Sequence, residues 1–481
     1  MTPTMPTAAD LLPLLPELVL IGATFALLML DLFIDESRRI ITHVLAIAIL
    51  VVVIVLIAAG VGGQGVVLNG MFIRDTMADV LKVVACGISA LALIYAWPFL
   101  RERGLYKGEV PILMLFAVGG MMLLISAGSL VMVYLGLEML ALCSYALVAI
   151  DRDSPLASEA AMKYFVLGSL ASGMLLYGLS LIYGATGTLD LAQIRASVEG
   201  SANADLLLAG VVFLVVGIAF KFGAAPFHMW LPDVYHGAPT PITLFIGSAP
   251  KLASFAMAYR LLEAGVGPLD DRWRLLIAGL AALSLFIGNV VALAQTNLKR
   301  LLAYSTISHV GFLFLGIAGG GPQGYAAAMF YAISYAIMST AAFGVIVVMS
   351  RGDFEADRID DFKGLNARSP WHAGLVMCVM ASLAGLPPFL GFWAKLAVLR
   401  AALEGGMLWL AIVGIVCAVI GAFYYIRVIK VMYFDEPDDD IRMVARDNRP
   451  LRIAFGVNAL GLLALGFAWN PIMAWCEQAF A

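Results

Sequence analysis

The sequence predicts an all-α polytopic membrane protein with about fourteen transmembrane helices. Its 481 residues are 62% hydrophobic and only 13% charged. The mean hydropathy is +0.96, far above that of a soluble globular protein. Apolar windows of about 20 residues, each long enough to cross a bilayer, recur along the whole chain. Their unbroken apolar character and internal glycines favour helices over the alternating strands of a membrane barrel.

The predicted spans are joined by short polar loops. In chain order they lie at approximately 11–33, 39–60, 76–99, 110–127, 130–150, 157–184, 204–228, 240–262, 273–293, 301–319, 323–349, 371–401, 407–434 and 451–476. Arginine and lysine gather in the odd-numbered loops, beginning with Arg38 and Arg39. Because positively charged loops stay in the cytoplasm, we expect the odd-numbered loops to face the cytoplasm and both termini to lie on the opposite side of the membrane.

Several function classes find no support in the sequence. No GxxxxGK[ST] phosphate loop is present, and no GxGxxG follows a strand, so we expect neither ATP nor a dinucleotide to bind this chain. The net charge is −4 and no basic cluster occurs, which argues against nucleic acid as a partner. The five cysteines lie in apolar runs without a CxxC pair, so we expect packing residues and no metal site.

An internal repeat divides the chain. The residues 160–164 (AAMKY) are echoed 167 positions later at 327–331 (AAMFY), and Pro226-Phe227 is echoed 162 positions later by Pro388-Phe389. The two copies are five spans apart, so they enter the membrane from opposite sides and form an inverted repeat, as in many transporters. The predicted units are therefore three N-terminal helices (1–109), a first five-helix repeat of spans 4–8 (110–262), a second inverted repeat of spans 9–13 (263–434), and a cytoplasmic loop with the last helix (435–481).

Two of the predicted helices are broken. The seventh span contains Gly223 to Pro226, and the twelfth contains Gly385 to Pro388. Proline removes a backbone donor, and the carbonyls it frees need partners or water at membrane depth. Either break alone is most simply a packing kink. Lysine lies within about two helical turns of each break, at Lys221 and Lys395, which favours a proton site.

A row of ionisable residues lies in apolar surroundings. Its members are Glu138, Lys163, Lys221, Lys251 and Lys395. A charge at the centre of a bilayer costs about 3 kcal/mol on insertion scales. Burial favours a neutral amine, and a nearby carboxylate favours the charged form, so a Glu–Lys pair can switch proton affinity when one partner moves. We therefore expect Glu138 and Lys221 to pair, and protons to pass along the lysines and His309.

Plainer interpretations exist for each of these residues. Glu138 and Lys221 could be a structural ion pair between the fifth and seventh helices, and the other lysines could be simple charge partners. His309 could equally be a hydrogen-bonded core residue, and His228, beside the first break, is more typical of a structural residue. Asp79 and Lys82, at i and i+3, indicate a local ion pair or a snorkelling lysine.

Three long motifs carry a resemblance to a known family. They are KFGAAPFHMWLPD at 221–233, NLKRLLAYSTISH at 297–309 and GLPPFLGFWAK at 385–395. The chain resembles, over almost its whole length, the antiporter-like subunits of respiratory complex I and of multisubunit cation/proton antiporters. The resemblance implies that Glu138 and Lys221 form the antiporter-type pair, that Lys163 modulates it, that Lys251 is the central relay lysine, and that Lys395 is the terminal proton-transfer residue.

The resemblance also narrows the branch of the family. Complex I has three antiporter-like subunits. The longest of them carries a C-terminal lateral helix for which this chain is too short, and another typically carries Glu at the position of Lys395. The chain is therefore most similar to the remaining subunit. That branch implies a proton-translocating membrane subunit of NADH:quinone oxidoreductase. It also implies a multi-pass protein of the bacterial inner (plasma) membrane, in which the side opposite the cytoplasm, where both termini are expected, is the periplasm. Its partners would be membrane lipid and the other membrane subunits, including further antiporter-like ones. No cofactor is expected in this chain; NADH, FMN, iron–sulfur clusters and quinone are expected in partner subunits.

Two alternatives remain at this point. The first is a subunit of a multisubunit Na⁺/H⁺ antiporter without redox coupling, which the motifs barely distinguish from the main interpretation. The second is a structural membrane scaffold whose charges hold helices together. The scaffold predicts that neutralising Lys221 harms assembly and not transport.

Overall fold

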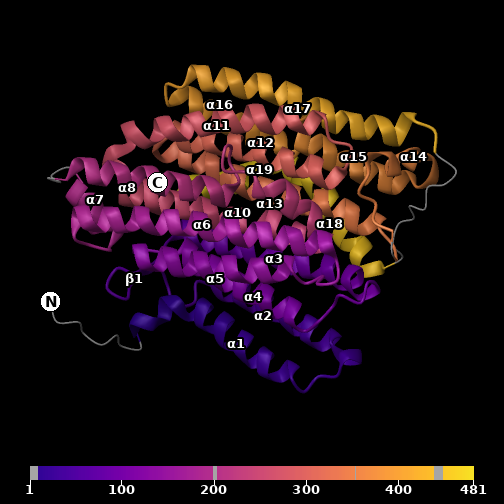
Figure 1. Cartoon of the computed structure of the whole chain (residues 1–481), viewed down its shortest axis with the longest axis horizontal. Coiled ribbons are helices and arrows are strands. Elements are labelled where there is room, and N and C mark those ends of the chain that lie inside the picture. The colour runs from indigo at the N-terminus through magenta and orange to yellow at the C-terminus, as the bar shows by residue number, and fades with distance from the viewer. Residues whose placement is uncertain (1–8, 199–202, 353, 438–447) are drawn as a thin grey trace.

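A computed structural model describes residues 9–198, 203–352, 354–437 and 448–481. Long helices lie side by side through the molecule (Figure 1). The N-terminal helices α1 and α2 lie at one edge, and α16 and α17 lie at the opposite edge. The N-terminal residues 1–8 lie outside the described residues, and the expected side of each terminus stays a prediction.

The described residues form nineteen α-helices, with short 3₁₀ and π segments and one hairpin. The α-helices are α1 (Leu15–Asp31), α2 (Ile40–Ala58), α3 (Thr76–Glu102), α4 (Glu109–Ile125), α5 (Leu130–Val148), α6 (Pro155–Thr186), α7 (Leu191–Val198), α8 (Ala204–Phe222), α9 (Trp230–Gly237), α10 (Thr240–Ala258), α11 (Asp270–Leu293), α12 (Leu298–Gly319), α13 (Gly321–Met349), α14 (Leu365–Arg368), α15 (Pro370–Ala384), α16 (Leu390–Glu404), α17 (Leu408–Phe434), α18 (Arg449–Phe467) and α19 (Trp469–Gln478). The 3₁₀ segments are η1 (Ala9–Leu14), η2 (Glu36–Arg38), η4 (Gly267–Leu269) and η5 (Ile359–Phe362), and η3 (Tyr259–Gly265) is a π-helix. The strands β1 (Gly65–Val67) and β2 (Phe72–Arg74) pair antiparallel.

The all-α polytopic class predicted from the sequence is confirmed. Twelve helices within the described residues are long and apolar enough to cross a membrane. Two shorter apolar helices, α4 and α15, coincide with the predicted spans 110–127 and the first half of 371–401. The total of fourteen spans stays a prediction. Both predicted breaks are present, because seven residues separate α8 from α9 and five separate α15 from α16.

Three helices form the buried core of the bundle. In α10, α12 and α13, between 89% and 94% of the residues in the most apolar stretch are buried, against 33% in α2. A helix buried on all sides must satisfy any polar group it carries with other protein groups. Lys251 of α10 and His309 of α12, two of the polar residues predicted from the sequence, lie in this most buried part of the bundle.

The internal repeat predicted from the sequence is reflected in two equivalent helix crossings, α4 with α5 and α11 with α12. A Cβ added to Gly120 of α4 would lie 2.6 Å from the Leu140 nitrogen of α5. A Cβ added to Gly288 of α11 would lie 2.5 Å from the Ser308 nitrogen of α12. Each residue of the second pair stands 168 positions after its counterpart in the first. Backbone therefore approaches backbone at the same point of both repeats, where only glycine fits.

The N-terminal helices correct one expectation. Asp79 and Lys82 do not pair with each other. Asp79 accepts from Arg74 at 2.8 Å, and the Lys82 amine lies 2.6 Å from the carboxylate of Glu17 in α1. The side chains of Lys82 and Glu17 are 1% and 2% exposed, so Lys82 is not a snorkelling lysine either. The partner lies on another helix, which i, i+3 spacing cannot reveal.

The close crossing of α11 and α12 leads to a stability prediction. Replacing Gly288 by leucine should force the two helices apart and lower the free energy of unfolding by about 1–3 kcal/mol. Gly279→Leu on the same helix is the matched control, since a Cβ there meets nothing within 4 Å. The thermal unfolding midpoint in detergent measures both. Equal midpoints for the two variants would show that the crossing is not tight.

Candidate functional site

The first break exposes the C-terminus of α8 to a buried lysine. α8 ends at Phe222, and Gly223 follows with the left-handed φ of +74° that favours glycine. Lys251 of α10 is 2% exposed and donates from its Nζ to the Phe222 carbonyl oxygen at 2.7 Å. The last carbonyls of a helix have no partner within it, and that end carries partial negative charge. The amine therefore occupies a site built for a cation.

The second break has the same arrangement. α15 ends at Ala384, and Gly385 follows with a φ of +81°. Lys395 of α16 donates from its Nζ to the carbonyl oxygens of Leu383 at 3.0 Å and Ala384 at 2.9 Å. Ala384 stands 162 positions after Phe222, the same offset as the two Pro-Phe pairs. The two acceptors are thus equivalent in the repeat, although the lysines come from different helices.

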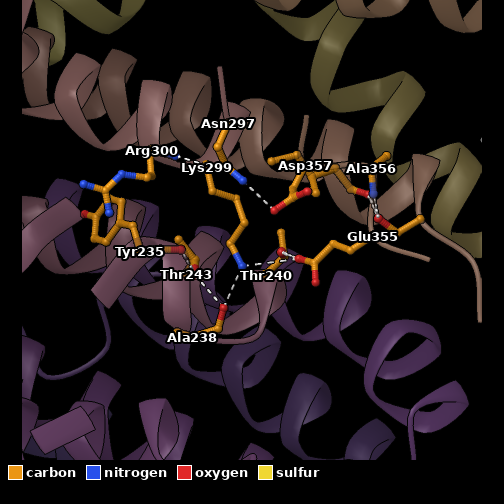
Figure 2. A network of polar contacts seen from close by, with 12 residues as sticks. Tyr235, Ala238, Thr240, Thr243, Asn297, Lys299, Arg300, Glu355, Ala356 and Asp357 are labelled. Carbon is orange, nitrogen blue, oxygen red and sulfur yellow. Dashed lines mark hydrogen bonds and ion pairs between the residues drawn. The ribbon is translucent and has the colours of Figure 1, made fainter. Parts of the chain in front are cut away.

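A third lysine binds the carbonyl at the C-terminal end of α9. Lys299, at the start of α12, is 3% exposed and donates to the Ala238 carbonyl oxygen at 2.9 Å. Figure 2 shows its amine between that carbonyl and the carboxylate of Glu355, which lies 3.3 Å away. The hydroxyl of Thr240 donates to the same carboxylate. The broken seventh span is therefore held by lysine at the end of each half.

Charges on α9 also bind its neighbours. Asp233 of α9 accepts from Lys163 of α6 at 2.7 Å and from Arg300 of α12 at 3.1 Å. Lys163 also pairs with Glu159 at 2.7 Å, and its side chain is 42% exposed. Its direct partners are thus acids on α6 and α9. The modulating role of Lys163 stays a prediction, and any such influence on the Glu138–Lys221 pair would have to act at a distance, for example through α9.

Glu138 and Lys221 form what we call an open pair: their charges interact, but no direct bond between the two side chains is seen among the described residues. Glu138 is half-buried in α5, and Lys221 is the next-to-last residue of α8. Among the described residues, no hydrogen bond or salt bridge joins them, and Oε1 of Glu138 is buried without a hydrogen-bond partner. The two charges still interact at longer range, as do those of Lys221 and Lys251. Direct pairing therefore requires one of the two to move.

His309 lies between two tyrosine hydroxyls in the core. Its Nδ1 is 2.7 Å from the hydroxyl of Tyr331 of α13, and its Nε2 is 3.1 Å from that of Tyr425 of α17. Tyr425 is in turn hydrogen-bonded to Ser305 of α12. Lys395 lies within Coulombic range of the imidazole. The histidine thus joins three helices through groups that can both donate and accept a proton.

The tyrosines were missed by the sequence reasoning. For Ser305 and Thr306 a signal was available in the predicted span 301–319, where hydroxyl residues accumulate beside His309 (AYSTISH), but Tyr331 and Tyr425 lie in other helices and had no such signal. Hydroxyls at that density in a buried helix indicate a polar network. His228, which the sequence marks as more typical of a structural residue, lies half-buried in the connection between α8 and α9 and faces the backbone of Pro226. The described contacts do not bring it to the lysines.

These features define a class: a polytopic, antiporter-like membrane protein with two broken helices and buried lysines. Comparison with known proteins supports this class. The family described as NADH:quinone oxidoreductase/Mrp antiporter, TM, matches residues 127–421. NADH-quinone oxidoreductase subunit N of Xanthomonas euvesicatoria pv. vesicatoria is 68% identical over 100% of this chain and 99% of its own length.

Solved structures show the same fold. A chain of respiratory complex I from Thermus thermophilus, solved with bound Aureothin, superposes with a TM-score of 0.81 at 30% identity, covering 95% of this chain and 98% of that one. A chain of the Mrp complex from Dietzia sp. DQ12-45-1b gives 0.84 at 22% identity, covering 99% and 97%, and supports the fold alone. The chain belongs to this antiporter-like family, and within it to the subunit N members of NADH-quinone oxidoreductase.

The Glu355 contacts lead to a pH prediction. Burial acts to raise the pKa of Glu355, but the Lys299 ammonium and the Thr240 hydroxyl outweigh it and hold the pKa below its ordinary value. A lowered carboxyl pKa stabilises the fold above the ordinary value of about 4.3, and this contribution is lost as the pH falls through the lower folded value. The thermal midpoint of the native chain should therefore fall on acidification below that value by more than the midpoint of Glu355→Gln. Parallel curves for the two proteins would contradict the assignment.

Proposed function

We propose that this chain is a proton-translocating membrane subunit of NADH:quinone oxidoreductase. Oxidation of NADH and reduction of quinone, with FMN and iron–sulfur clusters, would take place in other subunits, and this chain would hold no redox centre. Its partners would be the other membrane subunits of that complex, including further antiporter-like ones, and membrane lipid. Support comes from the close relationship to subunit N proteins along the full chain.

One observation carries the proposal: each broken helix ends on a buried lysine amine. Lys251 and Lys395 both donate to carbonyls that the breaks leave without a helical partner. Lysine is a compact ammonium whose proton affinity responds strongly to burial and to nearby charge. A lysine bound to helix-end carbonyls is stabilised as an ammonium and becomes easier to deprotonate when it leaves them. The contact can therefore load and release a proton.

The order of transfer follows the contacts between helices. A signal from the redox subunits would reach the open pair Glu138–Lys221 and bring the two together or apart. The Lys221 charge acts on Lys251, so a change at the pair alters proton binding at the first break. The proton would then cross the core through the hydroxyls that surround His309. It would leave through Lys395, whose charge acts on that histidine.

The tyrosines give this crossing a physical basis. Tyr335 donates to Thr306 at 2.7 Å, one residue from Ser305, which is bonded to Tyr425. A hydroxyl can accept one proton and donate another, so a chain of hydroxyls passes a proton without carrying net charge for long. His309 lies within this network, between the hydroxyls of Tyr331 and Tyr425, and Lys395 lies within Coulombic range of it. We therefore add Tyr331 and Tyr425 to the relay residues predicted from the sequence.

Lysine substitutions in the assembled complex test this function. Lys251→Ala and Lys395→Ala should each slow proton transfer through this chain by about 100-fold or more, since a positioned acid–base group contributes at least that much. The number of protons pumped per NADH in liposomes should fall. Lys430→Ala is the control, because Lys430 is 60% exposed and its ion pair among the described residues is a local one with Asp435. The complex should co-purify with flavin and NADH–quinone reductase activity.

The outcomes separate the alternatives. Copurification of small membrane proteins without flavin, with Na⁺-dependent proton flux, would replace the proposal by a Na⁺/H⁺ antiporter subunit. Loss of the assembled complex in the lysine variants, with a normal proton ratio in what remains, would favour the scaffold.

A further inference from the structure

The end of α15 forms a cradle around the amine of Lys395. Two consecutive carbonyl oxygens, from Leu383 and Ala384, lie 3.0 and 2.9 Å from its Nζ. The ring of Phe312 lies 5.2 Å away on another side. The next residue, Gly385, turns the chain away with its left-handed φ. Its missing side chain leaves the space that the lysine occupies.

A methyl group at Gly385 would strike the lysine. An added Cβ would lie 2.8 Å from Cδ of Lys395, 3.1 Å from Nζ and 3.3 Å from Cε. Real Cβ atoms essentially never come within 3.0 Å of a non-bonded heavy atom, so the flexible end of the lysine or the backbone must shift. The backbone has little room to do so, because the start of α16 is packed onto the end of α15. A Cβ on Gly391 would collide with the Ser382 carbonyl, and the Gly391 nitrogen donates to the Ser382 hydroxyl at 3.3 Å.

The equivalent glycine in the first repeat has no such contact. Gly223 has a similar φ, but its added Cβ would meet Leu231 of α9 and not an amine. The reason is the different origin of the two lysines. Lys251 reaches its carbonyl from α10, whereas Lys395 folds back along its own broken span from α16. The dependence of the amine on glycine is therefore a property of the second break alone.

We propose that Gly385 is a positioning residue for proton transfer: it holds open the place in which the Lys395 amine binds the two carbonyls at the end of α15. This inference rests on the proposed function, since it assumes that Lys395 carries protons. Gly385 has no ionisable group and does not bind the proton itself; its role is to position the amine of Lys395. Any larger residue at this position would separate the amine from its acceptors.

The test compares two alanine variants with similar backbone strain. Gly385→Ala should lower the number of protons pumped per NADH by at least half of the loss produced by Lys395→Ala. Gly406→Ala is the matched control, because its φ is +78° and a Cβ there meets nothing within 4 Å. The control should keep the native ratio. A purely structural defect would reduce the amount of complex and leave the ratio of the remaining complex unchanged. Equal ratios for the two alanine variants would overturn the inference.

Failure of the function and failure of the inference give different results. If Lys395→Ala pumps normally, the proposed function fails. If Lys395→Ala is defective and Gly385→Ala matches the control, only the positioning role fails.

A double variant covers the case in which Gly385→Ala assembles poorly. With Lys395→Ala also present, the obstructing side chain is gone, so the double variant should regain part of the thermal stability lost by Gly385→Ala. If the stability losses of the two substitutions simply add, the methyl group does not meet the lysine and the inference is wrong.

Discussion

The unpaired carbonyl at the end of a buried helix is the constraint on which this structure depends. Inside a membrane no bulk water can satisfy it, and several such ends lie within this bundle. Besides the three lysines, arginines bind the ends of unbroken helices: Arg260 at Ile125 of α4, Arg427 at Leu293 of α11, and Arg274 at Gly319 of α12. The contact repeats so widely that it organises the fold, because each cation ties the end of one helix to the side of another.

The choice of cation differs between the two kinds of helix end. The arginines lie at the ends of α4, α11 and α12, where a loop or the next helix begins, and a guanidinium stays protonated under all physiological conditions. The ends at the two breaks carry lysine, which can lose its proton. Lys299 at the end of α9 is an exception, because this lysine binds a helix end that is not a break and also pairs with Glu355. A permanent cation is suited to a structural cap, and a titratable one is suited to a transfer site. A break inside the membrane places unpaired carbonyls, which need a cation, at the depth at which the proton is transferred.

The sequence predicts the parts of this site that are locally visible. Proline beside glycine marks each break, and a lysine in an apolar run is conspicuous, so Lys221, Lys251 and Lys395 could be found without a structure. Their acceptors could not, because Lys251 binds a carbonyl 29 positions away and Lys299 binds one 61 positions away. The same limit explains why the acid paired with Lys82 was misassigned. Backbone acceptors have no sequence signature at all, since every residue carries one.

The relay illustrates a second limit. Single charges stand out in an apolar helix, whereas tyrosine and threonine are ordinary membrane residues. Tyr331, Tyr425 and Ser305 come together from three helices around His309 only when the core is packed. Periodicity predicts which residues share a helix face, but not which faces meet. The geometry of the relay therefore had to come from the structure.

Electron cryomicroscopy of the assembled complex, at a resolution that places lysine amines and bound water, tests the central claim most directly. At rest, the amine of Lys251 should lie within hydrogen-bond distance of the Phe222 carbonyl, and that of Lys395 should lie on the Leu383 and Ala384 carbonyls. During turnover, at least one amine should leave and water should take its place. Amines turned away at rest, with the carbonyls bound to another group, would contradict the account.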